Sequence, residues 1–137
     1  MNVYQLTDLY FVSPQIEVED VQKIADAGFA KIICNRPDEE VPSYLHANAM
    51  KTVAVDVGIE FEILPLTHVT MTTDNIEKQF EMVAAAKGPV LAYCASGTRC
   101  TIAWALSQAG KVDADELIRT AMKAGYDIEG LRSALVS

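Results

Sequence analysis

Short apolar runs alternate with longer amphipathic stretches along most of this chain, and this alternation limits the possible folds more than any other feature of the sequence. Three compact apolar runs, at 30–35, 59–66 and 89–93, have the length and composition of buried strands. Strands joined by helices pair in parallel through right-handed crossovers, which place helices on both faces of the sheet. The sequence therefore predicts an α/β fold of three layers, with a mainly parallel central sheet between helices.

Glycine, proline and helix-capping residues set the expected limits of the other elements. The segment 3–13 alternates enough to form one or two short strands. Ser43 is expected to cap the helix that ends at Gly58, and Asp74 or Thr73 to cap the helix after the strand at 59–66. The helical spacing of apolar residues and the positions of the glycines together predict helices at 15–29, 43–58, 74–87, 99–109, 113–124 and 127–135.

The length and composition of the chain exclude several broad classes of protein. Its 137 residues fit one domain, 1–137, and are half hydrophobic and 22% charged, which excludes intrinsic disorder. No run of about eighteen apolar residues occurs, so no membrane span is expected. The N-terminus lacks both the basic start and the apolar core of a signal peptide. We therefore expect a cytoplasmic protein.

The charge balance and the cysteine and histidine counts exclude further kinds of partner. Eleven Lys and Arg against nineteen Asp and Glu give a net charge of −8, which argues against nucleic acid or an anionic membrane as the main partner. The three cysteines contain no C-x-x-C pair and do not make a secreted disulfide framework. The two histidines lie far apart, so a zinc site is not expected, and we predict neither a metal nor a cofactor.

The segment 88–106, GPVLAYCASGTRCTIAWAL, has the pattern of an anion-binding loop between a buried strand and a helix. Cys94 ends the strand, and four residues separate it from Arg99. The loop N–H groups can converge above the cysteine sulfur, Gly97 lets the backbone turn, and Arg99 offers a bidentate fork to phosphate oxygens. The same field lowers the pKa of such a cysteine by roughly one to five units. A thiolate facing a bound phosphate can attack phosphorus and form a thiophosphate intermediate.

The alternative interpretation of these residues is structural. A lone cysteine is most often a small core residue. In this interpretation Cys94 only fills space in the hydrophobic core, and Arg99 is an ordinary surface residue. The order of strand, cysteine, small residues, glycine, arginine and helix favours function, because a motif gains weight from its structural context.

Two further polar side chains follow predicted strands at the same edge of the sheet. Arg36 comes directly after the strand at 30–35, and His68 follows the strand at 59–66. Ligands of parallel sheets bind beyond the carboxyl ends of the strands. We therefore expect both side chains to lie near Cys94, where Arg36 can add positive potential.

Several stretches of the chain together resemble a known family. CASGTR with GPVLAYC before it, AGFAKIICNRPDEE at 27–40 and GIEFEILPL at 58–66 are similar to the bacterial phosphatase-like family that is also found fused in beta-lactamase hydrolase-like proteins. The resemblance covers nearly the whole chain. It implies a dual-specificity-phosphatase-like fold and cysteine-dependent hydrolysis of a phosphorylated small molecule or phosphoprotein, with Cys94 as nucleophile and Arg99 as phosphate clamp. It implies that the phosphate is cradled by the N–H groups of Ala95, Ser96, Gly97 and Thr98.

The cysteine loop also differs from the H-C-x-x-G-x-x-R pattern that is usual in cysteine phosphatases. Arg99 comes one residue early, Cys100 stands where the arginine would be, and Tyr93 replaces the histidine. We count Cys100, with Arg36, among the candidate phosphate-binding residues. The spacing C-x-x-G-x-R matches the shorter loop of rhodanese-like sulfurtransferases, which cradle a persulfide. Two alternatives to a phosphatase follow: a rhodanese-like sulfurtransferase or persulfide-handling enzyme, and a non-catalytic phosphate-binding or interaction domain.

A phosphatase of this kind needs a general acid to protonate the leaving alcohol. In the loop LPLTHVTMTTD at 64–74, His68 lies closest to the place where such phosphatases carry an aspartate. Asp74 is expected to serve as a helix cap instead, and Asp38 is a third candidate from the neighbouring loop. Without a strong acid, the enzyme should act slowly on alkyl esters and faster on aryl esters.

The other two cysteines are candidate partners of Cys94 in oxidation. Cys34, at the end of the strand at 30–35, and Cys100 are each expected to be small core residues. A sharper hypothesis makes one of them a resolving thiol that captures oxidised Cys94 as a reversible disulfide. With Cys34 as the resolver, Cys34→Ser should make inactivation by peroxide irreversible.

Overall fold

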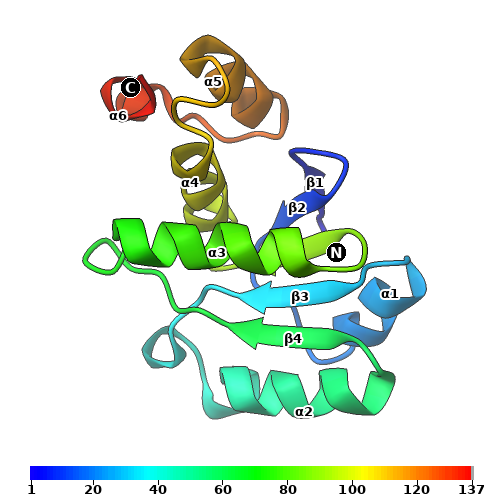
Figure 1. The fold of residues 1–137 in the computed structure, drawn as a ribbon. Coiled ribbons are helices and arrows are strands. Elements are labelled where there is room, and N and C mark those ends of the chain that lie inside the picture. The colour runs from blue at the N-terminus through cyan, green and yellow to red at the C-terminus, as the bar shows by residue number, and fades with distance from the viewer. Residues whose placement is uncertain (137) are drawn as a thin grey trace.

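The computed structural model, which describes residues 1–136, is built around one five-stranded sheet (Figure 1). The strands lie side by side in the order β1-β2-β5-β3-β4. Strand β1 pairs antiparallel with β2, and the other neighbouring pairs are parallel, so four strands end at one edge of the sheet. The strands are β1 (Tyr4–Gln5), β2 (Tyr10–Ser13), β3 (Lys31–Cys34), β4 (Glu60–Ile63) and β5 (Val90–Tyr93).

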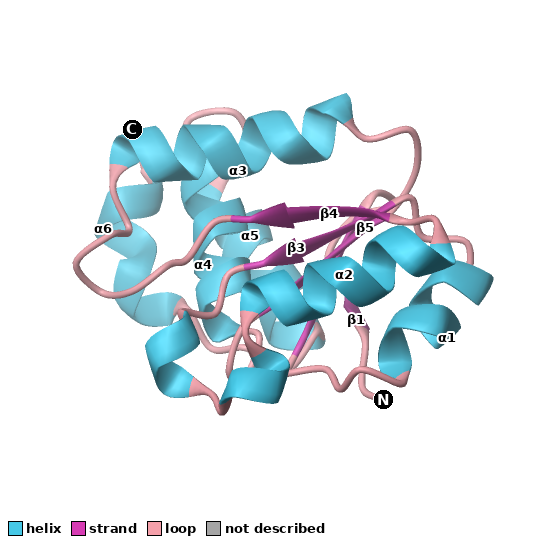
Figure 2. Cartoon of the chain, turned by 90° about the horizontal axis from the view of Figure 1, so that it is seen from below, coloured by secondary structure: helices cyan, strands magenta, loops and turns pink. Residues whose placement is uncertain are grey.

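Helices cover both faces of this sheet, as Figures 1 and 2 show from two directions. Helices α1 (Asp20–Asp26) and α2 (Ala47–Val57) pack on one face. The helices of the other side are α3 (Thr73–Ala85), α4 (Thr98–Ser107), α5 (Ala114–Lys123) and α6 (Arg132–Leu135). Three short 3₁₀ turns complete the fold: η1 (Asp38–Glu40), η2 (Ser43–Leu45) and η3 (Glu129–Leu131). The predicted three-layer α/β architecture is confirmed.

Strand β5 is apolar throughout because both of its faces are buried. Val90 and Ala92 pack into the core under α4 and α5, while Leu91 and Tyr93 pack into the core under α1 and α2. Successive strand side chains point to opposite faces, and a strand buried on both faces therefore needs apolar residues at every position. The next residue, Cys94, points to the α4 side. This alternation places the cysteine beneath the start of α4.

The predicted start of the second helix is wrong. Ser43 begins the turn η2, and α2 starts only at Ala47, whose N–H donates a hydrogen bond of 2.8 Å to Asp38 Oδ1. Gly58 ends this helix in a left-handed conformation, with φ of 92°, as expected. The first helix likewise starts later than predicted, at Asp20, since residues 15–17 belong to no helix and residues 18 and 19 form a turn.

The cap of α3 also differs from the prediction. Thr72, rather than Thr73 or Asp74, accepts the N–H of Asn75 at 3.2 Å.

Among residues 1–136, no helix combines the length and the apolar character needed to cross a bilayer.

A buried polar network joins β2, α3 and α4 to the residues that directly follow β3 and β4. The side-chain amides of Asn35 and Gln79 exchange two hydrogen bonds of 2.8 and 2.9 Å, and Asn35 also donates to the carbonyl of Leu64. Gln79 donates to the hydroxyl of Tyr10, which in turn donates to the carbonyl of Cys100 at 2.8 Å. Buried amides that are paired in this way resist displacement, because an unpaired partner would cost the full desolvation penalty. The network fixes α3, β3 and α4 relative to one another.

Candidate active site

The segment from Cys94 to Thr98 forms a tight loop between β5 and α4. The Cys94 sulfur is buried, and it accepts a hydrogen bond from the N–H of Gly97 at 3.1 Å. Gly97 has φ of 96°, and a Cβ there would lie 2.2 Å from the hydroxyl of Tyr126. The loop thus curls around the sulfur at the N-terminus of a ten-residue helix, where backbone N–H groups and the helix dipole favour an anion.

The surroundings of Cys94 stabilise its thiolate. A hydrogen bond from the Cys100 thiol lowers the pKa of Cys94 most, and the backbone N–H groups of Cys100, Gly97 and Arg99 lower it further, to about 5, although burial opposes them. Complete burial raises the pKa of Cys100 well above its ordinary value, so Cys100 remains a protonated donor. At neutral pH the loop therefore holds a thiolate, the form that acts as a nucleophile.

Arg99 is fixed at the mouth of the loop by Glu40. Its Nη1 and Nη2 atoms donate to the two carboxylate oxygens of Glu40 at 3.0 and 2.7 Å, and Nη1 also donates to the carbonyl of Leu66 at 2.8 Å. Among the hydrogen bonds within residues 1–136, none uses the Nε–H of Arg99, so the Nε–Nη2 edge remains available for an oxyanion.

Glu40 lies in the segment that follows β3, where it binds Arg36. Because it also binds Arg99, it links this segment to the one that follows β5. Arg36 Nε donates to Glu40 Oε1 at 3.3 Å, and Arg36 Nη1 donates to Gln15 at 3.3 Å. The hydrogen bond from Arg99, assisted by Arg36, lowers the pKa of Glu40. Arg36 lies near the site, as predicted from the sequence, whereas Glu40 and Gln15 were not among the predicted site residues. The four-residue spacing between Arg36 and Glu40, in a loop at the ligand edge, was the available signal for Glu40.

The three candidate acids are placed differently. His68 is exposed on the loop after β4 and lines the same cavity as Arg99 and Glu40. The Asp38 carboxylate accepts the first N–H of α2 and lies 3.9 Å from His46 Nδ1, and Asp74 is exposed in the first turn of α3. Neither aspartate lines the cavity beside Arg99.

Among residues 1–136, no group of three or more histidine, cysteine or acidic side chains is arranged to hold a metal ion.

The structure separates the two candidate resolving thiols. Cys34 packs with Tyr93 under α1 and α2, and its thiol donates to the carbonyl of Arg36 at 3.5 Å. The buried hydroxyl of Tyr93 lies against Cys34 without a hydrogen bond of standard geometry. Cys100 is completely buried on the α4 side, where its thiol contacts the Cys94 sulfur. The Cys100 side chain therefore supports the thiolate from beneath and does not line the open side of the loop.

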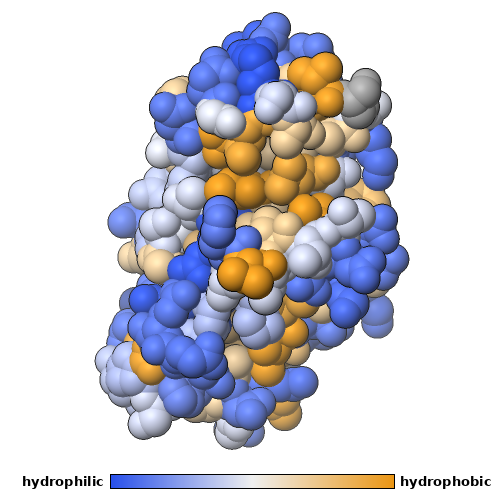
Figure 3. Space-filling view, turned by 90° about the vertical axis from the view of Figure 1, so that its left-hand side faces the viewer, coloured by the Kyte–Doolittle hydropathy of each residue, from blue (hydrophilic) through white to orange (hydrophobic). Residues whose placement is uncertain are grey.

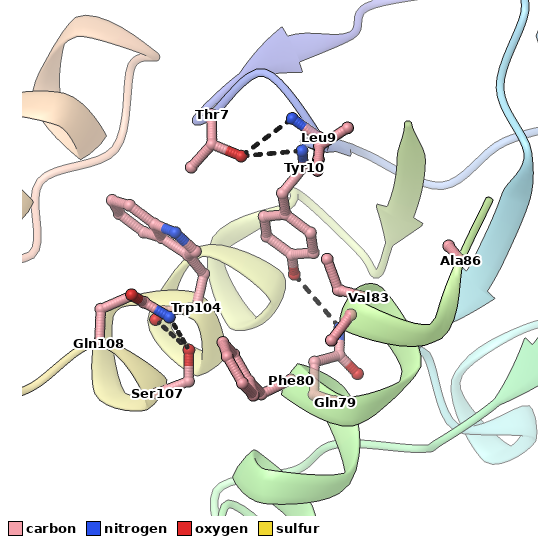
Figure 4. Close-up of a pocket in the computed structure, with 11 residues that line it drawn as sticks. Thr7, Leu9, Tyr10, Gln79, Phe80, Val83, Ala86, Trp104, Ser107 and Gln108 are labelled. Atoms are coloured by element: carbon pink, nitrogen blue, oxygen red, sulfur yellow. Dashed lines mark hydrogen bonds between the residues drawn. The ribbon is translucent and has the colours of Figure 1, made fainter. Parts of the chain in front are cut away.

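A second cavity, of about 330 Å³, lies between the β1–β2 hairpin, α3 and α4 (Figure 4). The aromatic rings of Tyr10, Phe80 and Trp104 line it, and its lining residues include neither a cysteine nor a charged side chain. Trp104 lies on a different face of α4 from Arg99. The Tyr10 hydroxyl, which lines this cavity, donates a hydrogen bond to the carbonyl of Cys100 in α4.

The fold places the chain among proteins with the dual-specificity-phosphatase-like architecture. It matches a candidate phosphatase from Neisseria meningitidis with a TM-score of 0.84 and 34% identity, over 98% of this chain and 96% of that one. It also matches PTPMT1 in complex with PI(5)P, with a TM-score of 0.75 and 13% identity, over 98% and 92% of the two chains.

The sequence identifies the family within this class. The profile of the family described as "Beta-lactamase hydrolase-like protein, phosphatase-like domain" matches residues 2–111, and the chain belongs to this family. A beta-lactamase hydrolase-like protein from Xylella fastidiosa is 27% identical over 130 residues, which make up 93% of this chain and 30% of the relative. The chain thus spans about 30% of the length of the curated relatives that it matches.

Proposed function

We propose that the protein is a cysteine-dependent phosphatase that hydrolyses phosphate monoesters without a metal ion. The observation that carries this proposal is the buried Cys94 sulfur, which accepts the Gly97 N–H at the N-terminus of α4, beside an Arg99 that Glu40 holds in place. The similarity to the PTPMT1 complex with PI(5)P supports a phosphorylated substrate, either a small molecule or a phosphoprotein.

The reaction would proceed in two displacements at phosphorus. The loop N–H groups and the Nε–Nη2 edge of Arg99 bind the nonbridging oxygens. The Cys94 thiolate forms an S–P bond while the P–O bond to the leaving group breaks, and His68 supplies the proton to that oxygen. Water then attacks phosphorus and passes a proton to His68 while the S–P bond breaks, which releases phosphate and restores the Cys94 thiolate. Because His68 is an exposed loop residue, aryl esters, which need little protonation, should react faster than alkyl esters.

Two parallel assays of the purified protein test this proposal. An aryl phosphate measures phosphate release, and thiosulfate with cyanide measures thiocyanate formation, each repeated with Cys94→Ser. We expect phosphate release that Cys94→Ser abolishes and that Cys34→Ser, the matched control on the opposite face of the sheet, preserves. Thiocyanate formation alone would refute the phosphatase, and no turnover in either assay would favour the non-catalytic binding domain.

The second candidate function is a rhodanese-like sulfurtransferase. The specific observation in its favour is the loop length, since only four residues separate Cys94 from Arg99. A persulfide on Cys94 would use the same N–H groups. The thiosulfate assay above distinguishes it directly, because sulfur transfer to cyanide does not require a phosphate ester.

A further inference from the structure

An open groove of about 570 Å³ extends from Arg99 along α4, and we name it the α4 groove. Arg99, Ile102 and Leu106 are spaced at i, i+3 and i+7 and so lie on one face of the helix. The remaining lining residues come from η1, the loop after β4, and η3; they are Glu40, Thr67, His68, Met71 and Leu131. Figure 3 faces this edge of the molecule and shows apolar side chains gathered between two polar areas.

The groove has a polar end and an apolar body. Arg99, Glu40 and His68 form the polar end, and Arg99 directly follows the cysteine loop in the sequence. Beyond Arg99, the wall is made by Ile102, Leu106, Met71 and Leu131, all partly buried. Beneath Met71 lie the fully buried Leu66 and Ala103, so the floor is packed. From Arg99 to Leu106 the helix rises about 10 Å, the length of a substituted aromatic ring or a short alkyl chain.

We infer that the α4 groove binds the apolar leaving group of the substrate, so that the preferred substrate class is an amphiphilic phosphate monoester whose aryl or alkyl body begins directly at the phosphate. This inference rests on the proposed phosphatase function for the placement of the phosphate in the cysteine loop. The groove and that loop meet at Arg99, whose side chain lines the groove and whose backbone N–H lies at the Cys94 sulfur. A leaving group that extends along the groove also passes His68, the proposed proton donor.

The test compares phenyl phosphate with 4-butylphenyl phosphate. A para-alkyl chain hardly changes the acidity of the phenol, so the two esters differ mainly in apolar length. Burying four more carbons should raise kcat/KM by about 10- to 100-fold. The gain should be in KM, because binding along the groove is the same in the ground state and the transition state. A ratio near one, with turnover that depends on Cys94, would overturn the inference and leave the phosphatase intact.

Variants in the groove sharpen the comparison. Leu131→Asn and Ile102→Asn should each lower the butylphenyl-to-phenyl ratio of kcat/KM by about threefold or more. Val55→Asn is the matched control, because Val55 is an apolar residue 66% exposed on α2, outside the groove. An unchanged ratio in both groove variants, with circular dichroism showing that they are folded, would contradict the inference.

A binding measurement separates this inference from the proposed catalysis. Calorimetry with Cys94→Ser gives the dissociation constants of the same two phosphates without turnover. We expect 4-butylphenyl phosphate to bind at least about tenfold more tightly than phenyl phosphate, even if no hydrolysis is seen with the wild type. Equal dissociation constants would refute the inference and would instead fit a groove that receives an apolar segment of another protein.

Discussion

At the scale of single residues, the contact between Cys94 and Cys100 is the most informative feature of the site. The Cys100 thiol packs in the same buried cluster as Cys94 and contributes most to the lowered pKa of Cys94. The residue thus replaces part of the support that a histidine before the cysteine would give, since Tyr93 points to the opposite face of the sheet. This exchange explains how the shortened loop can still hold a thiolate.

Removal of the Cys100 thiol should raise the pKa of Cys94. Loss of a hydrogen bond to a charged group disfavours the thiolate, so Cys100→Ala should move the pKa upward from about 5 by roughly one to two units. The acid limb of the kcat/KM profile, which rises with pH as the thiolate forms, should move to higher pH by the same amount. Thiolate absorbance at 240 nm, measured against Cys94→Ser, gives the pKa directly. Cys34→Ala is the control and should leave it unchanged.

Oxidation should use Cys100 rather than Cys34 as the resolving thiol. The Cys94 thiolate attacks hydrogen peroxide and becomes a sulfenic acid as hydroxide leaves; the Cys100 thiol then condenses with it to form the disulfide and water. Activity lost to peroxide should return with dithiothreitol in the wild type and in Cys34→Ser, but not in Cys100→Ser. Irreversible loss in Cys34→Ser alone would instead identify Cys34 as the resolving thiol.

Glu40 is a positioning residue that acts through Arg99. Glu40→Ala removes both carboxylate contacts, so the guanidinium loses its fixed orientation, and kcat should fall about tenfold or more. Inorganic phosphate should inhibit more strongly, because a negative charge beside the site is lost. The neighbouring exposed carboxylate offers a matched control, Glu39→Ala, which should change neither value. A fall in kcat without stronger phosphate inhibition would indicate a general loss of structure instead.

At the scale of elements, the start of α4 depends on a glycine and on a distant tyrosine. Gly97→Ala should destabilise the fold by about 1–2 kcal/mol from the left-handed backbone alone, and more from the clash with the Tyr126 hydroxyl. Gly125→Ala provides the control, because Gly125 has φ of 102° but no atom within 4 Å of its added Cβ. Thermal unfolding should therefore show a larger loss of stability for Gly97→Ala than for Gly125→Ala.

The elements themselves were largely predictable, and their contacts were not. Apolar runs and glycine punctuation indicate strands and helix ends through local physics, so the order of elements and the position of the cysteine loop follow from the sequence. Tyr126 supports the loop by donating to the Ser96 carbonyl from thirty residues further along the chain, and Gln79 is buried in a helix whose apolar residues suggest another inner face. Such contacts arise from tertiary packing, which no local pattern encodes.

At the scale of the whole molecule, the parallel arrangement explains why the predicted site residues converge. Cys94, Arg36 and His68 follow different strands, and parallel pairing brings all of these strand ends to one edge. Asp38 follows the same rule, but its carboxylate serves the start of α2. The edge rule therefore predicts which loops meet, whereas hydrogen bonding decides which side chains remain available for chemistry.

The pairing of Arg99 with Glu40 has a consequence for how substrates reach the protein. The chain has a net charge of −8, and the Glu40 carboxylate offsets the positive charge of Arg99 at the mouth of the loop. Little long-range attraction therefore remains for a phosphate dianion. Added salt should screen the overall repulsion and raise kcat/KM about twofold between low and physiological ionic strength, the opposite of the usual decline for phosphate-binding proteins. Glu40→Ala should weaken this rise. Diffusing anions are thus not drawn in from a distance, and selection takes place at short range, by shape and hydrogen bonding.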